Sequence, residues 1–156
     1  MSNLSYSYQK VASAFIALGD LEDARKATRD SLTIAARLIA VDPSNAGWAN
    51  DLGNLSYILV LARDFATALG VAEHAASLIP ETIGLYTNRA HALMFLDRID
   101  EARSLYLQHR GKHVAQHVVG ERTWEGVVRD DFTEMRKYGL EHKLMDEIEA
   151  LFAAGG

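Results

Sequence analysis

The chain has 156 residues, enough for one compact domain or one short array of stacked helix pairs but not for a second large domain. Apolar residues make up 49% of the sequence and only two residues are proline, so the composition favours helix and argues against disorder. The formal charge of -5 comes from acidic and basic residues mixed along the chain, which leaves no basic stripe for a nucleic-acid backbone.

The sequence contains no cysteine, which excludes disulfides, thiolate metal sites and a thiol nucleophile, and fits a reducing compartment. Its first ten residues are polar and rich in tyrosine, unlike an export signal. No apolar run reaches the roughly 18 residues that a membrane-spanning helix needs. We therefore expect a cytoplasmic protein that neither binds a membrane nor carries a cofactor.

Three short turn sequences recur at regular places in the chain. They are Gly19-Asp20-Leu21, Arg63-Asp64-Phe65 and Asp97-Arg98-Ile99. Their starts lie 44 and then 34 residues apart, and the alanines Ala24, Ala68 and Ala102 follow them with the same two spacings. Because small side chains let helix axes approach closely, this pattern predicts three helical hairpins in a common register.

Apolar and small residues at helical spacing flank each turn. In the middle unit these residues are Leu52, Leu55, Ser56 and Leu59 before the turn, and Phe65, Ala68, Ala72 and Ala75 after it. Residues three and four apart share one face of a helix, so each predicted helix has one packing stripe. The second helix of the first unit is about ten residues longer. Its stripe continues through Leu32, Ala35, Leu38 and Ile39 until Asp42-Pro43 ends it.

At these signature positions the chain resembles the tetratricopeptide repeat family, and its first unit resembles the longer repeats of kinesin light chains. The resemblance covers about residues 1–114, as repeats at about 4–47, 48–81 and 82–114. It implies an all-α fold, a right-handed α-solenoid of three helical hairpins. It also implies a non-catalytic scaffold that binds a protein or peptide in a concave groove. A generic helical bundle is the alternative fold.

Residues 115–156 do not fit the repeat and are expected to form a linker and carboxy-terminal capping helices. Thr123 is a candidate N-cap and Gly139 a candidate stop for the first of these helices. Its packing side is expected to contain Trp124, Val128, Asp131, Met135 and Tyr138. A last helix with the stripe Leu144, Met145, Ile148, Leu151 and Phe152 is expected to cover the third unit.

In a stack of such hairpins the first helices line the groove, so their outward residues are the candidates for partner contact. These candidates are Gln9, Lys10, Ser13, Asn50, Asn54, Tyr57, Asn88, His91, Met94 and Phe95. Asn54 and Asn88 hold the same place in successive units, and side-chain amides can pair with the backbone of an extended peptide. Two solvated polar residues are the alternative interpretation of this pair, and core packing is the alternative for the aromatic and methionine residues.

A structural or self-assembly role is the alternative function. Tyr6 and Tyr8 lie at an amino-terminal edge that no upstream repeat covers, so this edge is expected to pack on a second copy or on a longer array.

Three histidines, His109, His113 and His117, are spaced four residues apart, as in a helical metal site. Gly111 interrupts that helix, and no carboxylate completes a metalloprotease arrangement. We therefore expect neither a metal site nor an enzyme.

Overall fold

The computed structural model describes residues 3–45, 47–114 and 122–155, and within these ranges the side chains from residue 7 onward. The helices are α1 (Asn3–Ala17), α2 (Leu21–Val41), α3 (Gly47–Leu61), α4 (Phe65–Leu78), α5 (Tyr86–Phe95), α6 (Ile99–Gln108), α7 (Trp124–Lys137) and α8 (Lys143–Ala154). A single 3-10 turn, η1 (Ile83–Leu85), precedes α5, and β1 (His113–Val114) pairs antiparallel with β2 (Arg122–Thr123). The expected all-α class is confirmed.

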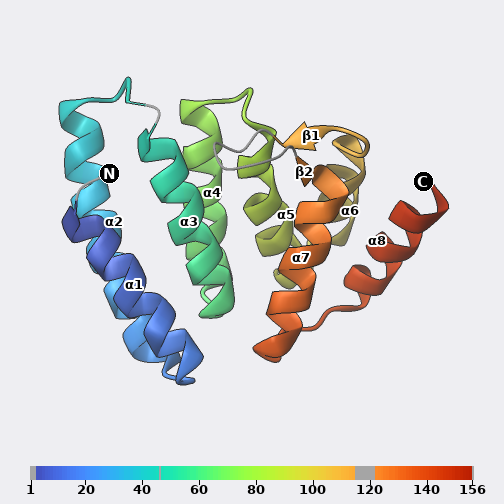
Figure 1. Cartoon of the computed structure of the whole chain (residues 1–156), viewed down its shortest axis with the longest axis horizontal. Coiled ribbons are helices and arrows are strands. Elements are labelled where there is room, and N and C mark those ends of the chain that lie inside the picture. Colours follow the sequence, from blue (N-terminus) through green and yellow to red (C-terminus); the bar gives the residue numbers. More distant parts are fainter. Residues whose placement is uncertain (1–2, 46, 115–121, 156) are drawn as a thin grey trace.

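Helices α1 to α6 follow one another along the molecule, and α8 lies at the end opposite to α1 and α2 (Figure 1). Helix α1 packs on α2, α3 on α4 and α5 on α6, while α2 contacts α3 and α4 contacts α5. The first six helices therefore form three successive pairs. None of the described helices is both long enough and apolar enough to span a bilayer.

The turns inside these three pairs have the same geometry. Each first helix is followed by a residue with positive φ, namely Gly19 (78°), Arg63 (63°) and Asp97 (59°). In each turn this residue's N–H bonds to the carbonyl three residues back, and the next N–H bonds to the carbonyl five residues back, at 2.8–3.0 Å. This Schellman arrangement satisfies carbonyls that the helix end leaves without partners.

The alanines Ala24, Ala68 and Ala102 have equivalent surroundings in the second helices. Each is fully buried and lies three residues after the start of its helix. Each N–H bonds to the carbonyl four residues back, at 3.1, 2.9 and 3.0 Å respectively. The described residues between 50 and 110 contain no β-strand. The equivalence expected from the sequence is therefore observed.

The additional residues of α2 are packed helix, as expected. Ala35 and Ile39 are buried in a core cluster with Trp48, Leu52 and Ala75, which belong to α3 and α4. Trp48 also closes the connection between α2 and α3, because its Nε1 donates to the carbonyl of Asp42 at 2.8 Å.

Helix α7 begins and ends where the sequence indicates. Thr123 Oγ1 accepts a hydrogen bond from the N–H of Gly126 at 3.0 Å, and Gly139 follows the helix with φ 77°. Its buried side consists of Trp124, Val128, Phe132 and Met135. Phe132, which was not expected on this side, is fully buried, while Asp131 is partly exposed but bonds to the buried His91. Tyr138 is exposed, so the expectation that it belongs to this side is wrong.

Helix α8 packs along α6, where Arg103 donates two hydrogen bonds to Glu147 at 2.7 and 3.0 Å. It therefore covers the third pair, as expected. Helix α7 does more than cap this pair, because its side chains contact α3 through Tyr57 and α5 through His91. It therefore lies beside the first helices of the second and third pairs.

Candidate functional site

A pocket of about 340 Å³ lies between α1, α3 and α7, and we call it the α1/α3/α7 pocket. This volume falls within the range of roughly 300–1,000 Å³ that is typical of ligand sites. The pocket is lined by Gln9, Lys10, Ser13, Ile16, Asn54, Tyr57, Ile58, Leu61, Glu134 and Tyr138. Five of the ten residues predicted to contact a partner are in this lining: Gln9, Lys10, Ser13, Asn54 and Tyr57.

The pocket combines buried apolar residues with several kinds of polar group. Ile16, Ile58 and Leu61 are all buried. Around them lie two side-chain amides, a serine hydroxyl, two phenols, one ammonium group and one carboxylate. Ligand sites are usually built in this way, with apolar contact area and a few polar groups that fix orientation.

Gln9 on α1 is the polar residue of the pocket whose bonding is incomplete. Its side chain is only 8% exposed, and its Nε2 has no hydrogen-bond partner among the described residues. Leaving a buried donor unpaired costs about 1–3 kcal/mol. An acceptor atom on a bound molecule would remove this cost.

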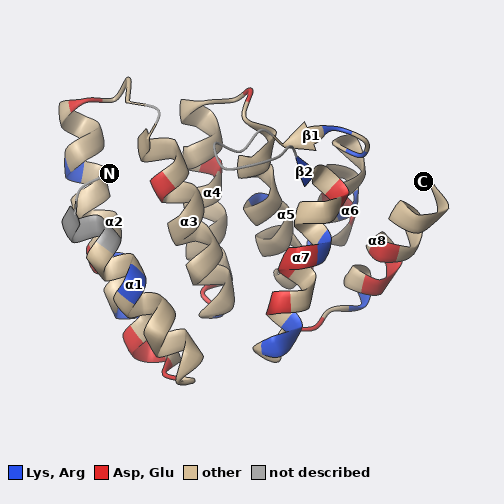
Figure 2. Cartoon of the chain, in the orientation of Figure 1, with Lys and Arg blue, Asp and Glu red and all other residues tan. Residues whose placement is uncertain are grey.

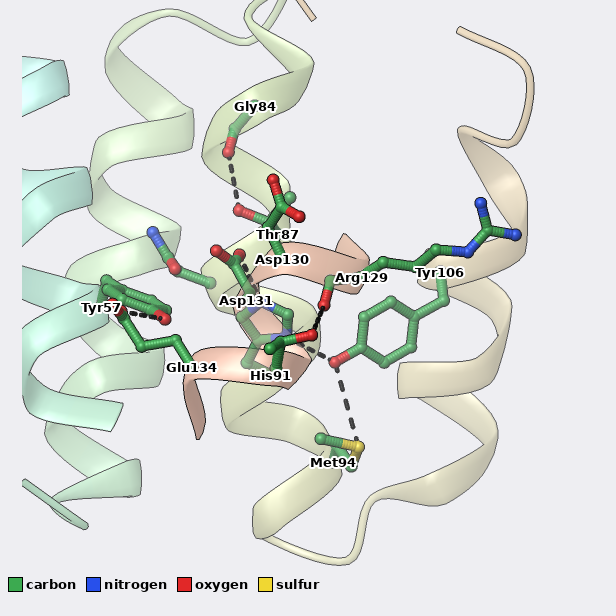
Figure 3. Close-up of polar contacts among 12 residues, drawn as sticks. Tyr57, Gly84, Thr87, His91, Met94, Tyr106, Arg129, Asp130, Asp131 and Glu134 are labelled. Carbon is green, nitrogen blue, oxygen red and sulfur yellow. Dashed lines mark hydrogen bonds and ion pairs between the residues drawn. The ribbon is translucent and has the colours of Figure 1, made fainter. Parts of the chain in front are cut away.

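Two contacts connect α7 to the region of α3. Tyr57 Oη donates to Glu134 Oε1 at 2.7 Å (Figure 3). Burial raises the pKa of Tyr57 above its ordinary value, and the nearby charges of Asp131 and Glu134 add to this rise, so the phenol remains a donor. Beyond the end of α3, Arg63 Nη2 donates to the carbonyls of Tyr138 and Gly139, at 3.3 Å each.

A buried polar chain holds α7 against α5 and α6. His91 Nε2 lies 2.9 Å from Asp131 Oδ2, and His91 Nδ1 lies 2.6 Å from Tyr106 Oη (Figure 3). A carboxylate can only accept, so Nε2 donates to Asp131, and in the neutral imidazole Nδ1 then accepts from the phenol. Met94 Sδ lies 4.0 Å from the same phenol oxygen. Trp124 Nε1 completes the attachment by donating to the carbonyl of Tyr106 at 2.7 Å.

These hydrogen bonds link a carboxylate, an imidazole and a phenol in series, but the rings of His91 and Tyr106 are fully buried. Burial, followed by the charge of Asp131, raises the pKa of Tyr106 well above its ordinary value. Neither ring lines the α1/α3/α7 pocket. The arrangement therefore joins three helices and offers no reactive group to a molecule in that pocket.

The other predicted contact residues lie outside the pocket. Asn88 is buried and its Nδ2 donates to the carbonyl of Gly53 at 2.9 Å, so it bridges α5 and α3. His91 and Met94 are fully buried beside α6 and α7, and Phe95 stacks on Phe65 with 4.9 Å between ring centres. Asn50 is exposed but does not line the pocket.

These positions change the expectation for the asparagine pair. Asn54 is exposed in the α1/α3/α7 pocket, whereas Asn88 is already bonded within the fold. The two amides therefore do not form a continuous ladder for a peptide. The amide that accompanies Asn54 in the pocket is Gln9.

The other five lining residues, Ile16, Ile58, Leu61, Glu134 and Tyr138, were not among the predicted contacts. Glu134 and Tyr138 belong to the α7 region, which the sequence indicated only as a cap. Their spacing places them on a helix but does not indicate which neighbouring helix they face, so no signal in the sequence identifies them.

The three histidines considered as metal ligands have different surroundings. His109 is buried between the rings of Tyr86 and Trp124, at 5.4 and 4.9 Å between ring centres. Burial, with a smaller effect of Lys112, lowers the pKa of His109. His113 is exposed in β1, and His117 lies outside the described residues. Within the described ranges no three histidine, aspartate or glutamate residues are placed to share a metal ion.

Comparisons with protein-family models, with curated proteins and with solved structures found no match. The function is therefore inferred from the α1/α3/α7 pocket.

Proposed function

We propose that the chain is a non-catalytic binding module that holds an extended polypeptide segment in the α1/α3/α7 pocket. The observation that carries the proposal is the unpaired amide donor of Gln9, buried beside an apolar floor. A polypeptide backbone offers a carbonyl to such a donor, and the exposed amide of Asn54 can both donate to and accept from a further peptide unit. Ile16, Ile58 and Leu61 would then contact an apolar side chain of the segment.

We further propose that the three helix pairs are tetratricopeptide-like repeats of a right-handed solenoid, with α7 and α8 as its terminal elements. The repeated turns at Gly19, Arg63 and Asp97 support this, as does the offset of 34 residues between the second and third turns. In such an array the first helices face the groove, and α1 and α3 both contribute to the pocket. A reducing cytoplasmic location is proposed because the sequence lacks cysteine.

Selection of peptides from a display library of random linear heptapeptides tests the binding proposal. The selected peptides are then titrated against the wild type and two tryptophan variants. Ser13→Trp places a bulky side chain in the pocket, whereas Ala36→Trp places it on an exposed position of α2 outside the pocket. We expect the selected peptides to bind Ser13→Trp at least about tenfold more weakly, a loss of about 1.4 kcal/mol. Ala36→Trp is expected to match the wild type.

Two results would contradict the proposal. Either the library yields no peptide that binds the wild type, or the peptides bind Ser13→Trp as tightly as they bind Ala36→Trp.

Self-association is the second candidate function, and a specific observation favours it. Val11 on α1 is 46% exposed, and Leu18 in the turn directly after α1 is 81% exposed, so two large apolar side chains face solvent in this part of the chain. Light scattering at increasing concentration should then detect a dimer or larger assembly for the wild type and a smaller species for Leu18→Glu. A wild type that remains monomeric would exclude this function.

A further inference from the structure

The charges around the α1/α3/α7 pocket indicate what kind of segment it would hold, and this inference rests on the proposed function. Helix α3 contains one charged residue, Asp51, which is buried, so the floor contributes no exposed charge (Figure 2). The charged groups of the lining come from the two flanking helices. Lys10 lies on α1 and Glu134 lies on α7.

Glu134 is the acceptor that the pocket presents to a ligand. It is exposed, and its contact within the described ranges is the hydrogen bond from the uncharged phenol of Tyr57. That bond uses Oε1, and no lysine or arginine of the described residues forms an ion pair with the carboxylate. Asp131, one turn earlier on α7, adds a second negative charge, and its effect extends to Tyr57.

The opposite wall has a different chemical requirement. The buried Nε2 of Gln9 donates and cannot accept, so a ligand group that bonds to it would be a carbonyl or carboxylate oxygen. Lys10 is the next residue on α1 and also lines the pocket. A second cation on this side would be repelled by its ammonium group, so a cationic group of the ligand is directed towards α7.

We infer that the bound segment carries a lysine or arginine that pairs with Glu134, while one of its main-chain carbonyls accepts a hydrogen bond from Gln9. The two contacts lie on opposite walls, and one wall supplies a neutral hydrogen-bond donor while the other supplies a negative charge. They therefore set both the chemistry of the segment and its orientation across the pocket.

Charge exchange at Glu134 tests the inference with the same heptapeptide library. Peptides are selected separately on the wild type, on Glu134→Lys and on Glu81→Lys, a matched control that makes the same change at an exposed position outside the pocket. The wild type and Glu81→Lys should select peptides enriched in lysine or arginine. Glu134→Lys should lose this enrichment and favour aspartate or glutamate.

Single peptides from the wild-type selection then separate charge from folding. Glu134→Gln keeps an acceptor for Tyr57 but removes the charge, and we expect it to weaken binding of the basic peptides about tenfold with an unchanged circular dichroism spectrum. Gln9→Met keeps the size of the side chain but removes the donor. We expect it to weaken binding while leaving the unfolding midpoint equal to or above that of the wild type.

The outcomes distinguish this inference from the binding proposal. The selected peptides could bind in the pocket without being enriched in lysine or arginine, or they could show the same enrichment when they are selected on Glu134→Lys. Either result would overturn the role of Glu134 and leave the binding function in place. Unchanged affinity in Gln9→Met would overturn the role of Gln9. If no selected peptide binds Ser13→Trp more weakly than it binds the wild type, both the inference and the proposed function are wrong.

Discussion

Replacing His91 by phenylalanine should detach α7 from α5 without opening a large cavity. The substitution keeps an aromatic ring but removes the bond to Asp131 at 2.9 Å and the bond to Tyr106 at 2.6 Å. A hydrogen bond to a charged group contributes about 1.5–3 kcal/mol and a neutral one about 0.5–1.5 kcal/mol. Asp131 can regain some hydration because its side chain is 21% exposed. We therefore expect a loss of about 2–4 kcal/mol in the free energy of unfolding.

Urea unfolding at pH 7, followed by circular dichroism, measures this loss. The control is Tyr57→Phe, which removes the bond to Glu134; because Glu134 is exposed and water can replace the phenol, this change should cost less than about 1 kcal/mol. Tyr106→Phe combined with His91→Phe should cost less than the sum of the two single changes, with a coupling of about 0.5–3 kcal/mol. If His91→Phe is no more destabilising than Tyr57→Phe, the hydrogen bonds of His91 do not hold α7 in place.

Three further predictions concern stability. Ala68→Arg should lower the free energy of unfolding by about 3 kcal/mol or more, because Ala68 is fully buried between helices; an unchanged melting temperature would contradict this. Gly19→Ala should cost about 1–2 kcal/mol from the positive φ alone, since a Cβ at Gly19 meets no atom within 4 Å, and an unchanged urea midpoint would show that the turn relaxes. Burial raises the pKa of Asp51 above its ordinary value of 3.8, so its contribution to stability is fully present below that value and is lost as the pH rises through the folded-state pKa. Asp51→Asn should therefore stabilise the protein at pH 7 and lose this advantage near pH 3, and an equal effect at both pH values would contradict the assignment.

The local features of the chain could be predicted from its sequence because they depend on neighbouring residues. The turn after α1 requires a residue that tolerates positive φ, and Gly19 provides one. The long α2 could be recognised because its packing stripe continues to Ile39 before Asp42-Pro43. Thr123 was identified as an N-cap since its hydroxyl can reach the first turn of the following helix.

The features that the sequence did not reveal depend on which helix covers which face. Asp131 and Phe132 both fit helical spacing after Val128, so the pattern alone did not decide which one is buried. Asn54 and Asn88 are equivalent in spacing, but Asn88 finds the carbonyl of Gly53 within 2.9 Å. A repeat register predicts equivalent positions along the helices, but individual contacts between neighbouring pairs, such as this bond, make the two positions unequal.

In α7, most of the residues that attach the helix to the fold differ from the residues that line the pocket. Most of its anchoring groups, such as Phe132, are buried, whereas Glu134 on α7 and Tyr138 directly after it are exposed and line the pocket. Exchanges at such exposed positions usually alter stability by no more than about 0.5 kcal/mol. Substitutions at these two positions can therefore change ligand preference while the rest of the fold is kept. For this reason the α7 region is the segment to randomise when the protein is used as a scaffold for engineering.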